Sequence, residues 1–112
     1  EREAIYLTGG GTLSVFNTTV SGNAGDGIRV LNGTLQVENS TVLGHDLNGI
    51  RFQRVDGRTL FLRNTILHGN GLQGCTLVGV ANPTISTDGY NLSQGLGCEI
   101  QNGASNLTGV NP

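Results

Sequence analysis

The two cysteines of this chain have a spacing that indicates a chemical reaction between them, the formation of a disulfide bond. The sequence has 112 residues and only these two cysteines, Cys75 and Cys98. A disulfide requires Cα atoms about 4.4–6.8 Å apart, and strands of stacked repeats lie about 4.8 Å apart. If the chain repeats about every 23 residues, the two cysteines lie one above the other. We expect a disulfide that joins the last two repeats and an oxidising compartment; the alternative is two buried free thiols.

Basic and aromatic side chains recur at the same spacing and could bind an anion. Arg29 and Arg51 follow equivalent apolar residues, and a guanidinium group recognises carboxylates and phosphates. The chain has only two tyrosines, three phenylalanines and no tryptophan, so two outward phenylalanines favour a lateral contact. The alternative is an ordinary solvated surface. The column expected on one outer strand is Tyr6, Arg29, Arg51 and Gln73, and the complete predicted contact surface is Tyr6, Arg29, Arg51, Phe16 and Phe61.

The acids and histidines do not form a pattern that is typical of catalysis. Paired carboxylates hydrolyse glycosides, and metal sites need several convergent ligands. The corner residues Asp26, Asp46, Asp56, Asp88, His45 and His68 are expected in separate columns. We therefore predict structural roles for them, with no catalytic residue, no cofactor and no metal. The segment from Phe52 to Thr59 is longer than its counterpart from Val30 to Thr34, and the side where it lies is called here the long-loop side. The alternative is a carbohydrate-active site on this side, around Arg54, Asp56 and Arg58.

The elements that position these residues are internal repeats. Three segments read GTLSVFNTTVSGN, GTLQVENSTVLGH and GRTLFLRNTILHGN. Apolar and polar residues alternate within them, as expected for strands with one buried face. A repeat unit of about 22–25 residues cannot bury its apolar face alone and must stack on its neighbours. The expected columns are Leu13, Leu35, Leu60 and Ile85; Val15, Val37 and Leu62; Val20, Val42, Leu67 and Leu92; and Ile5, Ile28, Ile50 and Leu72.

These repeats predict an all-β fold, a single-stranded right-handed parallel β-helix. It is expected to have four to five coils of about 22–25 residues each, with three short strands per coil. The domain is expected to span 1–112, with coils at about 1–23, 24–45, 46–70, 71–94 and 95–112. The structural ladder is expected at Asn17, Asn39 and Asn64, because Asn tolerates a left-handed backbone. Further corner columns are expected at Asp26-Gly27, Asn48-Gly49 and Asn70-Gly71, and at Gly22, Gly44 and Gly69. The alternative is an antiparallel β-sandwich, which does not require aligned columns.

Composition limits the partners. The net charge is -2 and charged residues make up 12% of the chain, so we expect no nucleic-acid partner. No apolar stretch approaches the 18 or so residues of a membrane span. The chain contains no Met, and no polar helix is apparent at either end. We expect either a longer protein or copies that stack on one another.

The repeated phrase, the segment around Cys75, the stretch from Ser86 to Leu92 with its GYNL motif, Cys98 and the closing NLTGVNP together resemble a known family. They look like the C-terminal portion of bacterial secreted or surface right-handed β-helix repeat proteins, which are adhesin-like and similar in pattern to polymorphic outer-membrane repeats. The resemblance covers nearly the whole chain. It implies an extracellular or cell-surface location in bacteria and says little about activity.

The function expected from these observations is that of a non-catalytic, extracellular structural or adhesive module that acts by assembly. It would be a filament subunit or a component of a larger surface complex, with self-association or other surface proteins as partners. One alternative is a carbohydrate-binding or polysaccharide-degrading β-helix domain that acts on glycans. Another is a passive spacer segment of a giant surface protein.

Overall fold

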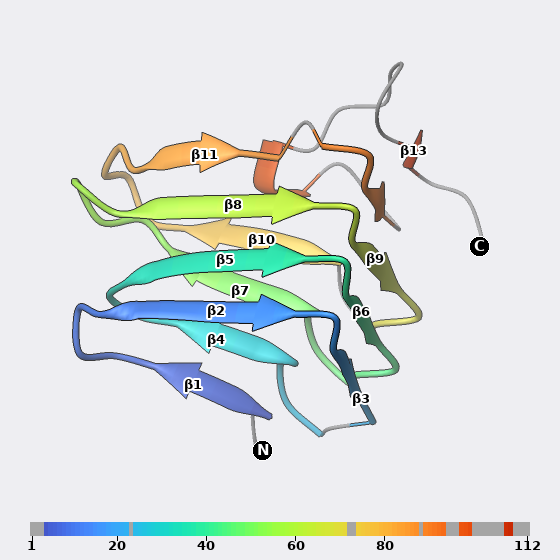
Figure 1. The fold of residues 1–112 in the computed structure, drawn as a ribbon. Helices are drawn as coiled ribbons and strands as arrows, with labels where there is room; N and C mark the ends of the chain where they lie inside the picture. Colours follow the sequence, from blue (N-terminus) through green and yellow to red (C-terminus); the bar gives the residue numbers. More distant parts are fainter. Residues whose placement is uncertain are drawn as a thin grey trace.

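The chain winds around an apolar core in successive coils, and the equivalent strands of these coils pair to form three parallel sheets (Figure 1). The computed structural model describes residues 4–22, 24–71, 74–87, 89–93, 97–99 and 107–108. The first sheet contains β1 (Ile5–Leu7), β4 (Ile28–Val30), β7 (Ile50–Gln53) and β10 (Cys75–Val78). The second contains β2 (Thr12–Phe16), β5 (Thr34–Glu38), β8 (Thr59–Arg63) and β11 (Thr84–Ser86). The third contains β3 (Thr19–Ser21), β6 (Thr41–Leu43), β9 (Ile66–His68), β12 (Leu92–Ser93) and β13 (Leu107–Thr108).

This arrangement is a right-handed parallel β-helix, as predicted. The strands β1–β3, β4–β6 and β7–β9 form three coils, β10–β12 form a fourth, and β13 pairs with β12. Every strand pair is parallel, which excludes the antiparallel sandwich. Besides the strands, the described chain has one short 3-10 turn, Gly97–Glu99. No helix in the described ranges is long and apolar enough to cross a membrane.

The core is a stack of aliphatic side chains, one from each coil. Leu13 pairs with Leu35, Leu35 with Leu60, and Ile85 with Leu60, as the repeat predicted. Leu35, Leu60 and Phe52 have no exposed surface. Because parallel strands in register place equivalent residues directly over one another, a repeated aliphatic residue forms a continuous column.

The corner between the second and third sheets bends through the predicted asparagines. Asn17, Asn39 and Asn64 have φ values of 52°, 51° and 49°, in the left-handed region that Asn tolerates better than most residues. The side-chain amide of Asn64 donates to Oδ1 of Asn39 over 3.1 Å. The predicted glycine corner also has positive φ at Gly22, Gly44 and Gly69.

A second, inner ladder lies one residue beyond the asparagines, and sequence analysis missed it. Oγ of Ser40 accepts from the Thr18 amide of the preceding coil over 3.1 Å, and its hydroxyl lies 2.8 Å from the Glu38 carbonyl oxygen and 3.4 Å from that of Val15 in the preceding coil. The Thr65 hydroxyl lies 2.9 Å from the Arg63 carbonyl oxygen of its own coil and 3.3 Å from the Val37 carbonyl oxygen of the preceding coil. In the fourth coil Asn91 takes the same position and accepts from the amide of Thr65. The buried polar groups of this corner therefore connect one coil to the next.

The predicted column of the first sheet is wrong after the loop between Phe52 and Thr59, whereas the pairs of Leu35 with Leu60, Val37 with Leu62 and Val42 with Leu67 are confirmed. Cys75, not Leu72, pairs with Ile50, and Thr76, not Gln73, pairs with Arg51; Leu72 and Gln73 themselves lie outside the described residues. That loop is longer than its counterpart in the preceding coil, so the equivalent residues Thr34 and Thr59 have a sequence separation of 25. Asp26 and Asn48 are equivalent at a separation of 22 residues, but this separation no longer relates equivalent residues after the longer loop.

The same shift changes the Asp-Gly and Asn-Gly corner. Asn70 was predicted above Asn48, but it lies above His45: the His45 amide donates to Asn70 Oδ1, and Gly71 N donates to the His45 carbonyl. One coil later the third sheet is also shifted by one residue. Leu92 pairs with Ile66, and Ser93 takes the core position opposite Leu67.

Candidate contact faces

The first sheet carries the predicted basic column on its outer face. Tyr6 pairs with Arg29, and Arg29 pairs with Arg51. The guanidinium carbon of Arg29 lies 5.7 Å from the centre of the Tyr6 ring, within the range of a cation–π contact. Thr76 continues the column, so this face presents two adjacent guanidinium groups beside an aromatic ring that is 49% exposed.

The two predicted phenylalanines lie on a different face, the outside of the second sheet. Phe16 is in register with Glu38, and Glu38 with Arg63; Phe61 is in register with Gln36. Phe16 is 48% exposed, whereas Phe61 is half-buried. The predicted contact surface is therefore divided between two sheets.

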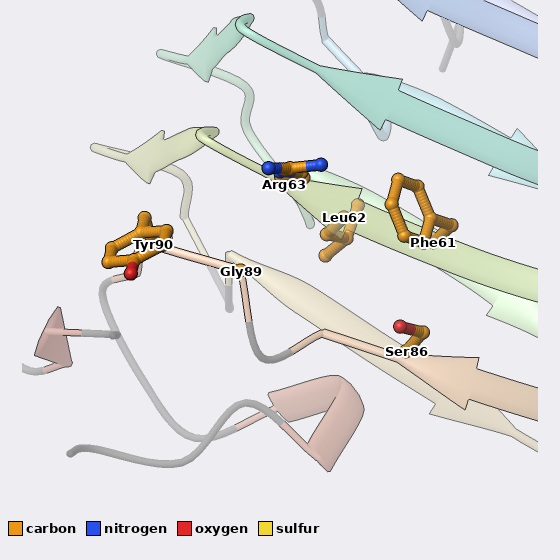
Figure 2. Close-up of a pocket in the computed structure, with 6 residues that line it drawn as sticks. All are labelled: Phe61, Leu62, Arg63, Ser86, Gly89 and Tyr90. Atoms are coloured by element: carbon orange, nitrogen blue, oxygen red, sulfur yellow. The ribbon is translucent and has the colours of Figure 1, made fainter. Parts of the chain in front are cut away.

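The fourth coil adds a hollow to this second face. Its volume is about 210 Å³, and it is lined by Phe61, Leu62, Arg63, Ser86, Gly89 and Tyr90. Figure 2 shows Phe61 and Tyr90 at its two ends, with Arg63 on one side and Ser86 on the other. For comparison, an apolar cavity of about 150 Å³ holds a benzene molecule. The hollow is thus large enough for one aromatic ring.

The fourth coil departs from the repeat at two adjacent positions, Gly89 and Tyr90, and both line the hollow. The amide of Asn64 donates to the Gly89 carbonyl, just as the Asn39 amide donates to the Arg63 carbonyl. Gly89 is therefore the fourth-coil equivalent of Arg63, and Tyr90 is the equivalent of Asn64. A Cβ atom at Gly89 would lie 3.0 Å from Cγ of Arg63, which is closer than an ordinary contact, so Gly89 allows the backbone of the fourth coil to pass close to the Arg63 side chain.

Tyr90 is in an unfavourable backbone conformation. Its φ is 62°, and a bulky residue with positive φ is a genuine outlier. Its side chain is 68% exposed, so core packing does not account for the conformation. Asn17, Asn39 and Asn64 have positive φ at the same corner, so the corner geometry imposes this conformation on Tyr90 and leaves its ring exposed.

The charged residues of the long-loop side bind neighbouring loops. Arg58 Nε donates to the side-chain oxygen of Asn32 over 3.1 Å, and Asp56 Oδ1 accepts from the backbone amide of Asn82 over 2.7 Å. These bonds hold successive loops together. They give Arg58 and Asp56 a structural task on the side where a carbohydrate-active site was the alternative.

Two of the titratable corner residues are buried inside the stack. Asp26 is 1% exposed, and its Oδ1 accepts from both the backbone amide and the side-chain amide of Asn48. His45 is 2% exposed, and its Nε2 lies 3.0 Å from the Val20 carbonyl oxygen. Both side chains join consecutive coils, as predicted for structural residues; Asp88 lies outside the described residues.

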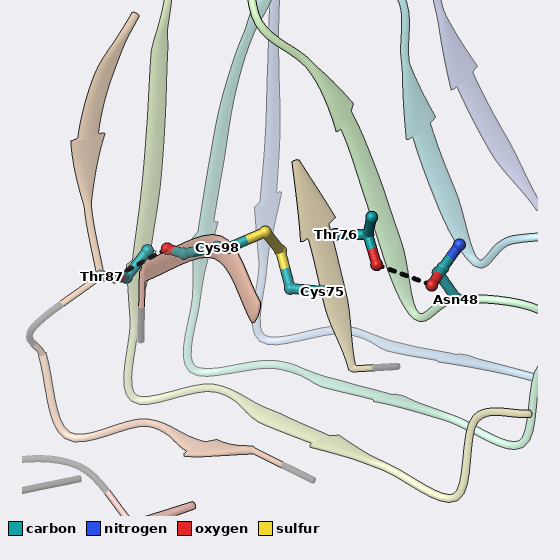
Figure 3. The surroundings of a disulfide bond; sticks show 5 residues. All are labelled: Asn48, Cys75, Thr76, Thr87 and Cys98. Atoms are coloured by element: carbon teal, nitrogen blue, oxygen red, sulfur yellow. Dashed lines mark hydrogen bonds between the residues drawn. A yellow bond between two sulfur atoms is a disulfide. The ribbon is translucent and has the colours of Figure 1, made fainter. Parts of the chain in front are cut away.

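The structure has a disulfide between Cys75 and Cys98 (Figure 3), with Cα atoms 5.5 Å apart. Cys75 occupies the core column of Ile28 and Ile50, and Cys98 is in the turn Gly97–Glu99 and is also buried. Thr87 Oγ1 donates to the Cys98 carbonyl. The predicted bond between Cys75 and Cys98 is therefore present, and it holds the short turn that follows the fourth coil against the core.

The comparisons with known proteins agree with this architecture. The family model described as "Right handed beta helix region" matches residues 2–111. The chain belongs to the right-handed β-helix family. No curated protein and no solved structure gives a significant match. Right-handed β-helix domains occur in enzymes and in non-enzymes, so membership defines the fold of this β-helix and leaves its activity to the surface residues.

Proposed function

We propose that this β-helix is a non-catalytic structural or adhesive module of a secreted or cell-surface protein, and that it acts by assembly. The observation that carries the proposal is the outer face of the second sheet. That face combines the half-exposed Phe16 with a hollow bounded by Phe61 and Tyr90. Exposed aromatic residues beside a hollow are typical of protein contact surfaces, because such rings bury large apolar areas.

The interior supports a scaffold role. Leu35, Leu60 and Leu67 are fully buried, and side chains such as Ser40 and Thr65 connect successive coils through hydrogen bonds. A stack of this kind holds its outer residues at fixed spacings, which suits a repeated contact with a partner. An extracellular location is part of the proposal, because a buried disulfide persists in oxidising compartments. A bacterial, adhesin-like origin rests on the sequence resemblance alone.

Assembly is tested with the purified, oxidised protein. We expect sedimentation velocity to show species larger than a monomer as the concentration rises, or capture of surface proteins on an immobilised β-helix. Substitution of Phe16 by Ser is expected to weaken either signal. A protein that stays monomeric at all concentrations and retains no surface protein would contradict the proposal.

A second candidate function, binding of an anionic glycan, rests on the first sheet. The Tyr6 ring and the Arg29 and Arg51 guanidinium groups form one column there. Aromatic rings stack on sugars, and guanidinium groups bind carboxylates or sulfates. On a glycan array we expect binding that falls with salt and is lost in Arg29→Ala/Arg51→Ala, while Arg63→Ala on the second sheet is a matched control. Equal binding by the double variant and the control would exclude this site.

A further inference from the structure

The outer positions of the second sheet form three columns that run across the four coils. One contains Phe16, Glu38, Arg63 and Gly89, and is called here the Phe16 column. Each of its residues comes from a successive coil, about 4.8 Å from the next. From the first coil to the fourth, this column presents an exposed aromatic ring, an acidic side chain, a basic side chain and the hollow beside Gly89. The other two columns are Ser14, Gln36, Phe61 and Ser86, and Thr12, Thr34, Thr59 and Thr84.

The Phe16 column is complementary to itself when it is reversed. A two-fold axis parallel to the strands, midway between the second and third coils, places the first coil of one copy against the fourth coil of the other. Phe16 then faces the hollow beside Gly89, and Glu38 faces Arg63. By symmetry each of these contacts occurs twice, as in any isologous interface.

The remaining columns are compatible with the same axis. Thr12 faces Thr84 and Thr34 faces Thr59, so the threonine column of one copy packs against the threonine column of the other. Ser14 faces Ser86, and Gln36 lies over the ring of Phe61. No two like charges face each other on the described part of this sheet, because Glu38 and Arg63 are its only charged outward residues.

We propose that the partner of the second sheet is a second copy of this chain, which binds face to face in an antiparallel, two-fold symmetric dimer. The inference rests on the proposed function and names its partner. The Phe16 ring of each copy fills the hollow of about 210 Å³ between Phe61 and Tyr90 of the other. Glu38 of each copy binds Arg63 of the other. The departures of the fourth coil from the repeat, Gly89 and Tyr90, form the socket for the ring.

The size of the face sets the strength of the dimer. Three strands of five residues and one of three, about 4.8 Å apart and with about 3.3 Å per residue, give a flat footprint of roughly 300 Å². A standard interface buries about 800 Å² on each partner. The dimer is therefore weak and forms at high protein concentration, or where copies are held close together on a surface.

A charge exchange tests the dimer. Glu38→Arg places Arg opposite Arg63 twice, and Arg63→Glu places Glu opposite Glu38 twice. Like charges that face each other in an interface weaken it, so we expect each variant to self-associate at least tenfold more weakly in sedimentation velocity. A one-to-one mixture of the two variants is expected to regain wild-type association as a heterodimer, and the double variant Glu38→Arg/Arg63→Glu to regain it as a homodimer.

The mixture separates the interface from effects inside one chain. Positions 38 and 63 are also neighbours within the chain, so each single variant keeps its own like-charge pair in the mixture. Regained association can then arise only between copies. Tyr6→Ser is the matched control, because Tyr6 is as exposed as Phe16 but lies on the first sheet. It is expected to leave the association unchanged, and circular dichroism verifies the fold of every variant.

The outcomes distinguish this inference from the proposed function. Wild-type self-association that both single variants retain, or that the mixture fails to restore, overturns the face-to-face dimer and leaves assembly through another face. A wild-type chain that stays monomeric at millimolar concentration also overturns the dimer, whereas assembly with other proteins is then decided by the capture experiment.

Discussion

Replacement of Tyr90 by Asn is expected to stabilise this β-helix, although it removes a large side chain. Tyr90 occupies the position of the ladder asparagines with φ of 62°, and a left-handed conformation costs an ordinary residue roughly 1–2 kcal/mol. Asn bears a smaller cost. Its amide can also extend the ladder that joins Asn64 to Asn39, which adds a net contribution of about 0.5 kcal/mol for an exposed bond. The ring is 68% exposed, so little apolar burial is lost.

The expected gain is about 1 kcal/mol, or roughly 4–8 °C in Tm for a domain of about this size. Urea denaturation and thermal unfolding followed by circular dichroism measure it. Two further variants separate the causes: Tyr90→Gly relieves the backbone without a new amide, and Tyr90→Ala removes the ring but keeps the strain. If the Asn and Gly variants are no more stable than the Ala variant, the assigned strain at Tyr90 is wrong.

Three other changes probe the core, the turn and the buried acid. Cys75→Ala/Cys98→Ala opens a loop of 23 residues and is expected to lower the free energy of unfolding by about 3 kcal/mol in urea denaturation; a variant as stable as the oxidised protein would contradict this. Leu35→Ala, at a fully buried site, should cost about 2–5 kcal/mol, and Leu13→Ala, at a partly exposed site of the same column, clearly less; equal losses would contradict the column. Asp26→Ala leaves two buried donors of the next coil without an acceptor and should cost about 1–3 kcal/mol, measured by thermal unfolding, whereas no loss would show that water replaces the carboxylate.

The fold could be predicted at those positions where every coil has the same backbone conformation and the same type of residue. Leu13, Leu35 and Leu60 recur because every coil needs an aliphatic residue at that core position. Asn17 and Asn39 recur because the corner needs a left-handed residue. Both requirements depend only on the position of the residue within its own coil, so they are visible in the sequence as a repeated residue type.

The prediction was wrong where loop length changed the spacing. Asn70-Gly71 follows Asn48-Gly49 at the same spacing at which Asn48-Gly49 follows Asp26-Gly27, yet the longer loop after Phe52 places Asn70 above His45. Hydrogen bonding explains how one column can hold two residue types: His45 and Asn70 each contact a carbonyl oxygen of the preceding coil, that of Val20 and that of Val42 respectively. Identity of residue type is therefore a poor guide to register across a loop of variable length.

The hollow could not be predicted, because it depends on residues that break the pattern. Nothing in the sequence marks Tyr90 as the fourth member of the asparagine ladder, or Gly89 as the counterpart of Arg63. The backbone bond from Asn64 to Gly89 identifies both. The spacing between equivalent residues of the preceding coils would identify Gly89 and Tyr90 only if the shift in register in the fourth coil were already known.

The most direct test of the account is a concentration series of amide NMR spectra of the wild-type protein. We expect signals of the second sheet, at Phe16, Glu38, Arg63 and Gly89, to shift together as the concentration rises, while those of Arg29 and Arg51 on the first sheet stay constant. Shifts confined to the first sheet, or spectra that do not change up to millimolar concentration, would contradict the claim that this β-helix pairs with a second copy through the outer face of its second sheet.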